Sequence, residues 1–250
     1  MNITLEHNKI YCGQLLLVNA GSALKSSNNE ELRAIDPRFP DIKLQAPAAD
    51  ALRLILSDIK AGNAIVPVSG YRSAAEQAAI YQKSMTEHGE EFTSRFVALP
   101  GRSEHQTGLA ADLGLNQDNI DFIRPYFPYK GICGAFRDAA PDFGFVERYP
   151  KGKEAVSGIA HEPWHFRYVG YPHSKIMSER RLILEEYIDF IKAYQESNKL
   201  YEKGKNSLFE IYYVPAAAEK TTISIPDRCD YRISGNNLDG FIVTVRRNRL

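Results

Sequence analysis

Pro163 is the residue that most restricts how this chain can fold around its histidines. It lies within residues 161–165, which match the H-E-x-x-H pattern whose two histidines bind zinc from one face of a helix. A proline inside a helix costs about 3 kcal/mol and biases the residue before it, here Glu162, towards extended backbone. We therefore predict that this segment is not helical, so that His161 and His165 do not bind one metal ion together.

A second polar segment, residues 103–112, supplies further groups of the metal-binding type. It contains His105 and Asp112 in apolar, glycine-containing surroundings. A catalytic zinc site needs three nitrogen or oxygen ligands, an open coordination position and a carboxylate that is not a ligand. His105, Asp112 and His165 fit the ligands, and Glu162 fits the general base. A lone histidine is more often a surface group, but together these residues favour a zinc hydrolase.

The periodicity of apolar residues predicts an α+β fold, with a small mixed or antiparallel sheet and flanking helices that hold the zinc site. Ser73 and Glu76 have the spacing of a capping box, which predicts the start of a helix. Residues 24–45 are polar and contain proline, so we expect a loop there. Strands are expected over residues 14–18, 64–69, 110–115 and 166–169, and helices over 46–60, from 74 onwards and over 182–197.

Beyond about residue 200 the chain becomes rich in β-forming residues that alternate with polar ones, over residues 209–214, 222–225 and 240–245. Turn-forming pairs such as Asn236-Asn237 and Asp239-Gly240 favour antiparallel pairing. We therefore predict a catalytic domain over residues 1–200 and a small β-rich C-terminal appendage over residues 201–250. A piece this small is marginally stable alone, so we expect a stabilising addition; a role in oligomerisation or substrate gating stays open.

Composition argues against several kinds of partner. Lysine plus arginine and aspartate plus glutamate both number 31, so no basic excess indicates nucleic acid. Residues 1–9 lack the pattern of a signal peptide, and no window of about 18 residues is apolar enough for a membrane span. Cys12, Cys133 and Cys229 are few and far apart, which is typical of a reducing compartment. We expect a cytoplasmic protein, either a monomer or a homodimer.

Three segments resemble, in order and spacing, the zinc D,D-peptidases of the VanY, VanX and VanXY group. The chain matches the group's S-x-H-x-x-G-x-A-x-D and E-x-x-H signatures, and the resemblance covers roughly residues 10–195. The amino-acid sequence of residues 96–100, 103–106 and 162–170 is most similar to the VanXY enzymes of vancomycin-resistance clusters, in particular to their VanG type. The segments are Ser69-Gly70-Tyr71-Arg72-Ser73 with Gln77, Ser103-Glu104-His105 through Asp112, and Glu162-Pro163-Trp164-His165.

The resemblance implies a zinc-dependent D,D-carboxypeptidase with D,D-dipeptidase activity. Its substrates would be the D-Ala-D-Ala dipeptide and the D-Ala-D-Ala termini of peptidoglycan precursors, and it would contribute to vancomycin resistance. It also implies the zinc ligands and base named above, with Arg72 as an electrophilic or substrate-binding group. Ser103 could bind the terminal carboxylate or merely cap a turn, and Gln77 could bind substrate or lie on a helix surface.

Ser69 is a departure from part of this group. VanX and some VanXY relatives have aspartate at this place, where an acid could hold the free ammonium of a dipeptide. A serine offers only a neutral hydrogen bond, which is roughly half as strong as a charge-assisted one. VanY-type carboxypeptidases also have serine here. We therefore expect activity to favour a longer precursor over the dipeptide, unless another acid, such as Glu104 or those in residues 87–91, replaces the missing one.

Two other functions remain open from the sequence. One is an L,D-carboxypeptidase of cell-wall peptides. The other is a catalytically silent zinc-binding module, because the same fold family includes the signalling domain of hedgehog proteins. Glu162 favours an enzyme, since a silent module does not need a spare carboxylate beside the metal.

Overall fold

The computed structural model describes residues 1–25 and 30–248 and divides into two compact units. Val18–Ile183 forms the central unit, and Met1–Leu17 together with Leu184–Leu250 forms the terminal unit. These bounds differ from the expected division at residue 200, because the first residues of the chain and the helix after residue 183 join the C-terminal strands. No helix in the described ranges is long and apolar enough to cross a membrane.

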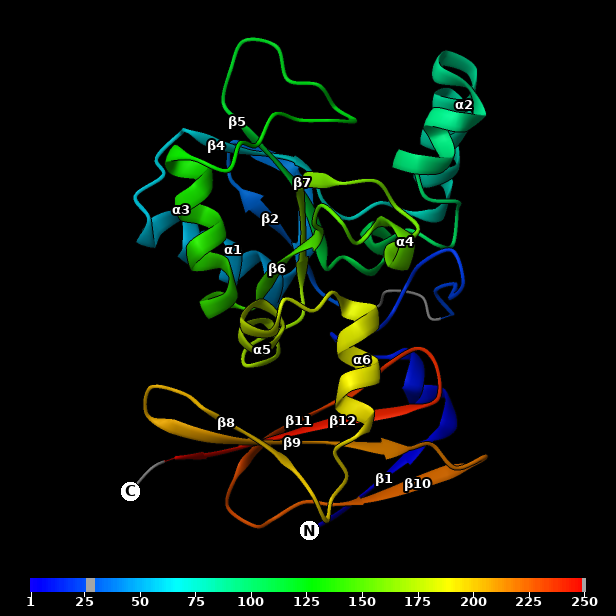
Figure 1. Cartoon of the computed structure of the whole chain (residues 1–250), viewed down its shortest axis with the longest axis vertical. Helices are drawn as coiled ribbons and strands as arrows, with labels where there is room; N and C mark the ends of the chain where they lie inside the picture. The colour runs from blue at the N-terminus through cyan, green and yellow to red at the C-terminus, as the bar shows by residue number, and fades with distance from the viewer. Residues whose placement is uncertain (26–29, 249–250) are drawn as a thin grey trace. The chain divides into compact units, whose positions relative to one another are not determined.

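An antiparallel sheet with the strand order β4-β5-β7-β6 forms the middle of the central unit (Figure 1). Register places Asp112 of β5 opposite Ser69 of β4 on one side and opposite His165 of β7 on the other. Three polar side chains therefore lie at one level of three adjacent strands. The strands are β4 Ile65–Ser69, β5 Ala110–Leu115, β6 Phe145–Tyr149 and β7 Glu162–Tyr168.

Helices α1, Ala46–Asp58, and α3, Gly131–Ala139, lie side by side against the sheet (Figure 1). Leu52 of α1 and Phe136 of α3 are fully buried in one hydrophobic core with Leu113 and Phe166 of the sheet. Burying such side chains contributes about 1.5–3 kcal/mol each. This core supports β5 and β7 from behind and fixes the strands that carry Asp112 and His165.

Helix α2, Ala74–Phe96, begins at the capping box that the sequence predicts. Oγ of Ser73 accepts the backbone N–H of Glu76, and the Glu76 carboxylate accepts the backbone N–H of Ser73. The helix is interrupted at Gly89, whose φ of 79° is outside the helical region. The capping box therefore fixes the direction in which the N-terminal half of α2 leaves the end of β4, and this half carries Gln77.

The rest of the central unit consists of short elements. The expected loop over residues 24–45 is wrong in its second half, which forms an antiparallel hairpin of β2, Leu32–Asp36, and β3, Phe39–Gln45. Residues 26–29 lie outside the described part of the chain. The remaining elements are η2 Glu104–Thr107, η3 Ala140–Phe143, α4 Glu154–Ser157 and α5 His173–Arg180.

The terminal unit contains a four-stranded antiparallel sheet with the order β11-β12-β9-β8 and a separate pair of β1 with β10. Helix α6 packs on β9. The expected C-terminal strands are thus confirmed, and the chain's first strand is added to them. The elements are β1 Asn2–Glu6, η1 His7–Tyr11, α6 Leu184–Lys192, β8 Leu200–Lys203, β9 Ser207–Pro215, β10 Lys220–Ser224, β11 Asp230–Gly235 and β12 Gly240–Asn248.

The α+β class is confirmed, but the strand expected over residues 14–18 is wrong. Leu15, Leu16, Leu17 and Val18 are buried, as an apolar run predicts, yet they form no strand. The backbone N–H of Leu15 donates to the side-chain hydroxyl of Ser234 in β11, and that of Leu17 donates to the carbonyl of Asn236 just after this strand. A side-chain hydroxyl and a loop carbonyl can thus satisfy a buried backbone without a ladder.

Candidate active site

An irregular strand places Glu162 and His165 in the same pocket. Side chains alternate along a regular strand, so residues three apart would face opposite sides of the sheet. The pairing of β7 with β6 shifts register between Phe166 and Glu162, around Pro163. This irregularity turns Glu162 towards His165, and Oε2 of Glu162 lies 3.8 Å from Nδ1 of His165. The extended conformation predicted from Pro163 is confirmed.

His105 reaches the same point from the short helix η2. Gly108 ends this helix with a φ of 71°, a left-handed conformation that suits glycine, and the chain turns directly into β5. Nδ1 of His105 lies 2.7 Å from the carbonyl oxygen of Gly70 and donates to it, because a carbonyl can only accept. Nε2 therefore faces inward, 3.1 Å from Oδ2 of Asp112.

The side chains of His105, Asp112 and His165 are buried, and their ligand atoms all lie within 4.8 Å of one another. Oδ1 of Asp112 is 2.9 Å from Nδ1 of His165, while Oδ2 faces His105. The outer nitrogen of each imidazole faces an oxygen, on Gly70 and on Glu104 respectively. Two oriented imidazoles and one carboxylate, with a free side towards the pocket, fit a zinc ion that keeps an open coordination position.

His161 does not belong to this group. Its Nε2 lies 2.7 Å from the hydroxyl of Tyr129 and 3.7 Å from Oε1 of Glu147. Its ring also stacks on Tyr129. The expectation that His161 and His165 do not share a metal agrees with this geometry. His161 lies just before β7, and the irregularity of the strand around Pro163 places the two side chains in different surroundings.

Glu162 is buried beside the metal-binding group, and this burial changes its acidity. Loss of solvent raises the pKa of Glu162 to about 8, against the opposing charge of His165. Burial lowers the pKa of His165, but the nearby carboxylates of Asp112 and Glu104 outweigh burial and raise this pKa to about 9. A divalent cation at the site would favour the carboxylate and the neutral imidazole, so it would lower both values. Glu162 is thus placed to exchange protons near neutral pH.

The contributions of Glu162 and His165 to the stability of the metal-free protein should fall as pH rises from about 5 to about 9. A folded-state pKa near 8 for Glu162, against 4.5 for the free residue, means that the folded state holds the proton longer. His165, at about 9 against 6.5, acts with the same sign: its contribution is complete below 6.5 and lost by about 9. Glu162→Gln should therefore raise the free energy of unfolding at pH 8 by on the order of 1–3 kcal/mol, and by less at pH 5. Urea unfolding in the presence of a chelator measures the free energy of unfolding at both pH values. A Glu162→Gln variant that is no more stable than wild type at pH 8 contradicts the prediction.

Arg72 lies at the edge of the metal-binding group and is fixed by the residues around it. Its Nε donates to the hydroxyl of Ser69 at 2.9 Å, and one terminal nitrogen donates to Oε1 of Gln77 at 3.2 Å. The other terminal nitrogen lies 3.0 Å from Oδ2 of Asp112 and 3.3 Å from Nε2 of His105. Gln77 is itself held by the carbonyl of Ala98 at 2.7 Å. The geometry thus gives Ser69 and Gln77 a part in orienting this guanidinium.

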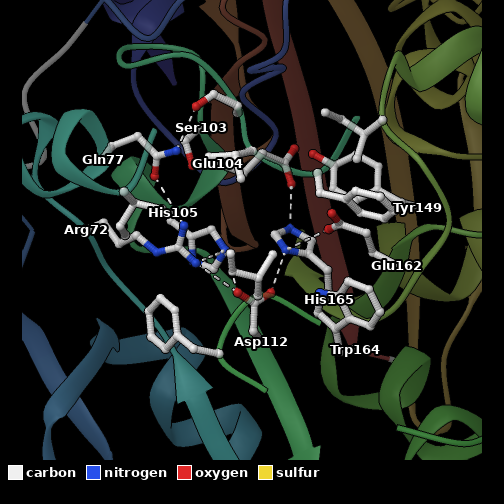
Figure 2. A pocket seen from close by; sticks show the side chains of 17 residues that line it. Arg72, Gln77, Ser103, Glu104, His105, Asp112, Tyr149, Glu162, Trp164 and His165 are labelled. Carbon is white, nitrogen blue, oxygen red and sulfur yellow. Dashed lines mark hydrogen bonds and ion pairs between the residues drawn. The ribbon is translucent and has the colours of Figure 1, made fainter. Parts of the chain in front are cut away.

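One pocket collects all the candidate residues except Ser69 (Figure 2). Ser103 lines it and is the N-cap residue of η2, but its side chain makes no capping hydrogen bond to this helix. Trp164 forms part of the pocket wall. Phe122 and Tyr149 also line the pocket, and no motif in the sequence singles them out. The ring of Phe122 lies 5.9 Å from the Arg72 guanidinium.

Glu104 cannot serve as a replacement anchor for a substrate ammonium. Its side chain is fully buried, and Oε1 lies 2.9 Å from Nε of Arg148 and 2.8 Å from a terminal nitrogen of Arg167. Burial opposes its charge, but the two guanidinium groups outweigh burial and hold the pKa of Glu104 well below its usual range. The suggestion that Glu104 reads the amine is therefore wrong, because this carboxylate is already paired.

The fold and the donor set define a zinc peptidase site, and comparison with known proteins identifies the family. The VanY family, described as D-alanyl-D-alanine carboxypeptidase, matches residues 41–171. The bifunctional D-Ala-D-Ala dipeptidase and carboxypeptidase VanXYC of Enterococcus gallinarum is 38% identical over 71% of this chain and 94% of its own length. The chain belongs to the VanY family, as the sequence motifs predict.

Solved structures agree with this assignment. The D,D-dipeptidase VanXYg, solved with a D-Ala-D-Ala phosphinate analogue, is 59% identical, with a TM-score of 0.97 over 99% of both chains. A VanY D,D-pentapeptidase mutant from a VanB-type resistance cassette, solved with Zn(II), is 25% identical, with a TM-score of 0.58 over 70% of this chain and 98% of its own. The zinc expected from the sequence thus agrees with a structural relative that holds this metal.

Proposed function

We propose that this chain is a zinc-dependent D,D-peptidase that removes the terminal D-alanine from peptidoglycan precursors, also splits D-Ala-D-Ala, and so contributes to vancomycin resistance. The observation that carries the proposal is the buried carboxylate of Glu162 beside the group formed by His105, Asp112 and His165. Similarity to VanXYg over nearly the whole chain supports the same substrate class. The cytoplasmic location expected from the sequence stays a prediction, and so does the choice between monomer and homodimer.

In this proposal His105, Asp112 and His165 hold the zinc ion and Glu162 moves the proton. Bound zinc supplies Lewis acidity, and it brings the pKa of a coordinated water to about 7. Glu162 accepts the proton of the attacking water and passes it to the leaving amine. Its burial supports this role, because burial raises the pKa of the carboxyl and a bound cation would lower it again, so that Glu162 would both take and return a proton near neutral pH.

Arg72 has the charge and direction to stabilise the oxygen of the scissile carbonyl as it becomes negative. A guanidinium stays charged and can offer two donors to oxygen. Ser69 and Gln77 would contribute mainly by holding Arg72, and both can exchange that bond for one to substrate. Ser103, which lines the same pocket, would bind the terminal carboxylate of the substrate.

A chromatographic assay of product release tests the proposal. Purified protein is given equal concentrations of D-Ala-D-Ala, D-Ala-D-Ser, a precursor pentapeptide ending in D-Ala-D-Ala, and a tetrapeptide with an L,D terminal bond, with zinc or with chelator. We expect zinc-dependent release of D-alanine from the pentapeptide and the dipeptide. Cleavage of the L,D bond alone would establish the L,D-carboxypeptidase alternative. If zinc-loaded protein cleaves none of these peptides, the remaining alternative is the catalytically silent zinc-binding module.

Ser69→Asp should raise kcat/KM for the D-Ala-D-Ala dipeptide relative to the pentapeptide. A new carboxylate could bind the dipeptide's ammonium, and a charged hydrogen bond contributes roughly 1.5–3 kcal/mol, or about 10–100-fold. Because Ser69 accepts from Nε of Arg72, the same carboxylate would also pair with this guanidinium, so we expect a gain near the lower end of that range. Ser69→Asn, of the same size but neutral, is the control. If both variants change the substrate ratio equally, charge at position 69 does not select the substrate.

A further inference from the structure

Glu104 belongs to η2, beside His105, and is held in a fully buried ion cluster. Both arginines that contact its Oε1, Arg148 from β6 and Arg167 from β7, have side chains with 0% exposure, as Glu104 has. Buried charges persist only where they are paired and hydrogen-bonded, and here two guanidinium groups contact one carboxylate oxygen. The sheet therefore keeps this carboxylate ionised and in one orientation.

The second oxygen of Glu104 points at the ring of His165 (Figure 2). Oε2 lies 3.6 Å from Nε2 of His165, and among the described residues neither atom has a partner within hydrogen-bond distance. Buried donors and acceptors without partners are rare and need an explanation. Here each of the two atoms can be the partner of the other, because a small rotation of the His165 ring brings them into a hydrogen bond.

The orientation of His165 decides which of its nitrogens can bind a metal. Nδ1 faces Asp112 and the rest of the metal-binding group, so a ligand bond must come from Nδ1. A neutral imidazole that binds through Nδ1 carries its proton on Nε2, and an acceptor at Nε2 favours that form. His105 is the reverse case: Gly70 takes the proton from Nδ1 and leaves Nε2 for the metal.

We propose that Glu104 is a positioning residue of the zinc site: it accepts the Nε2 proton of His165 and thereby presents Nδ1 to the metal, while Arg148 and Arg167 fix its carboxylate. This rests on the proposed ligand set and adds an outer residue to it. The carboxylate touches neither substrate nor reacting atoms, so it acts through His165 alone.

Substitution with glutamine gives a sharp test, because the amide has a single oxygen. Arg148 and Arg167 would both require that oxygen, so the amide nitrogen would donate to Nε2 of His165 and favour a proton on Nδ1. That form cannot bind zinc through Nδ1. Loss of an outer partner typically weakens metal binding 10–100-fold, and we expect this range for Glu104→Gln, measured as the zinc dissociation constant by competition with a chromophoric chelator.

Two further variants separate this role from a merely structural one. Glu104→Ala leaves room for a water that can accept the proton, so its zinc affinity should fall less than that of Glu104→Gln, although it loses more packing. Glu147→Gln makes the same chemical change in β6 at a carboxylate that pairs with Arg137 and lies near His161 instead of His165. Its zinc dissociation constant should stay within about threefold of wild type. A zinc dissociation constant of Glu104→Gln within threefold of the wild-type value overturns the proposal. So does weaker zinc binding by Glu104→Ala than by Glu104→Gln.

Wild-type protein decides the matter if the Glu104 variants do not fold. Nitrogen-15 spectra of the zinc-loaded enzyme, with imidazole-labelled histidine, should show His165 protonated on Nε2 and metal-bound through Nδ1. Zinc bound through Nε2, with the proton on Nδ1, overturns the role of Glu104 while leaving the zinc site intact. A His165 ring that does not respond to zinc contradicts the ligand set, and with it the proposed function.

Discussion

Glu162→Gln should lower kcat by about 10²–10⁴-fold and leave the zinc content unchanged, since general acid–base catalysis contributes that much. Glutamine keeps the size of the side chain and its place on β7 but cannot accept a proton. The group formed by His105, Asp112 and His165 is untouched by the change. The loss should therefore appear in kcat, with a smaller change in KM.

The measurement is steady-state hydrolysis of the pentapeptide, together with metal analysis of the same sample. Glu147→Gln is again the matched control, because Glu147 is a partly buried carboxylate on the neighbouring strand β6 that pairs with Arg137. Its activity should be close to that of wild type. Activity of Glu162→Gln within about threefold of wild type rules out this residue as the base. Loss of zinc from the variant would instead assign Glu162 to metal binding.

The residues of the central site could be predicted from the sequence because they lie in short segments with recognisable spacing. Pro163 excludes a helix over its own segment, which removes His161 from the ligand set and directs attention to His105 and Asp112. The spacing within residues 103–112 predicts the other two ligands, His105 and Asp112, since η2 and β5 follow one another directly. What spacing could not show is the register that sets Asp112 opposite both Ser69 and His165.

The outer part of the site was not predictable, because arginine is usually read as a surface residue. Arg148 lies on β6 and Arg167 on β7, and only the tertiary structure shows that both are fully buried around Glu104. The sequence instead suggested Glu104 as a possible anchor for substrate. A single sequence does not indicate which charged residues are paired in the interior.

Long-range pairing explains the other differences between prediction and structure. Strand β1 at the start of the chain pairs with β10, so Asn2 lies opposite Ser224, a partner that no local pattern reveals. The hairpin of β2 and β3 turns at Pro37, and proline with its polar neighbours resembles an irregular loop. In both cases the pairing partner, and not local propensity, makes the strand.

His105→Ala should abolish stable zinc binding and lower kcat/KM by about 10³-fold or more. Zinc contributes several kcal/mol of transition-state stabilisation, and each 1.36 kcal/mol corresponds to about tenfold in rate. Removing His105 leaves two ligands, Asp112 and His165, and also frees Arg72 to pair more closely with Asp112 through their existing 3.0 Å contact. A cation already present at the carboxylate then competes with the metal.

The matched control is His161→Ala, which removes the other histidine of the H-E-x-x-H pattern. His161 contacts Tyr129 and lies near Glu147, away from the metal-binding group, so this variant should keep one zinc per chain and near-normal activity. Metal analysis after dialysis against a weak chelator and pentapeptide hydrolysis measure both variants. One zinc per chain with normal turnover in His105→Ala would refute the ligand assignment. Loss of zinc from His161→Ala but not from His105→Ala would mean that His161 and His165 bind the metal together, as in the helical zinc proteases, despite the strand and Pro163.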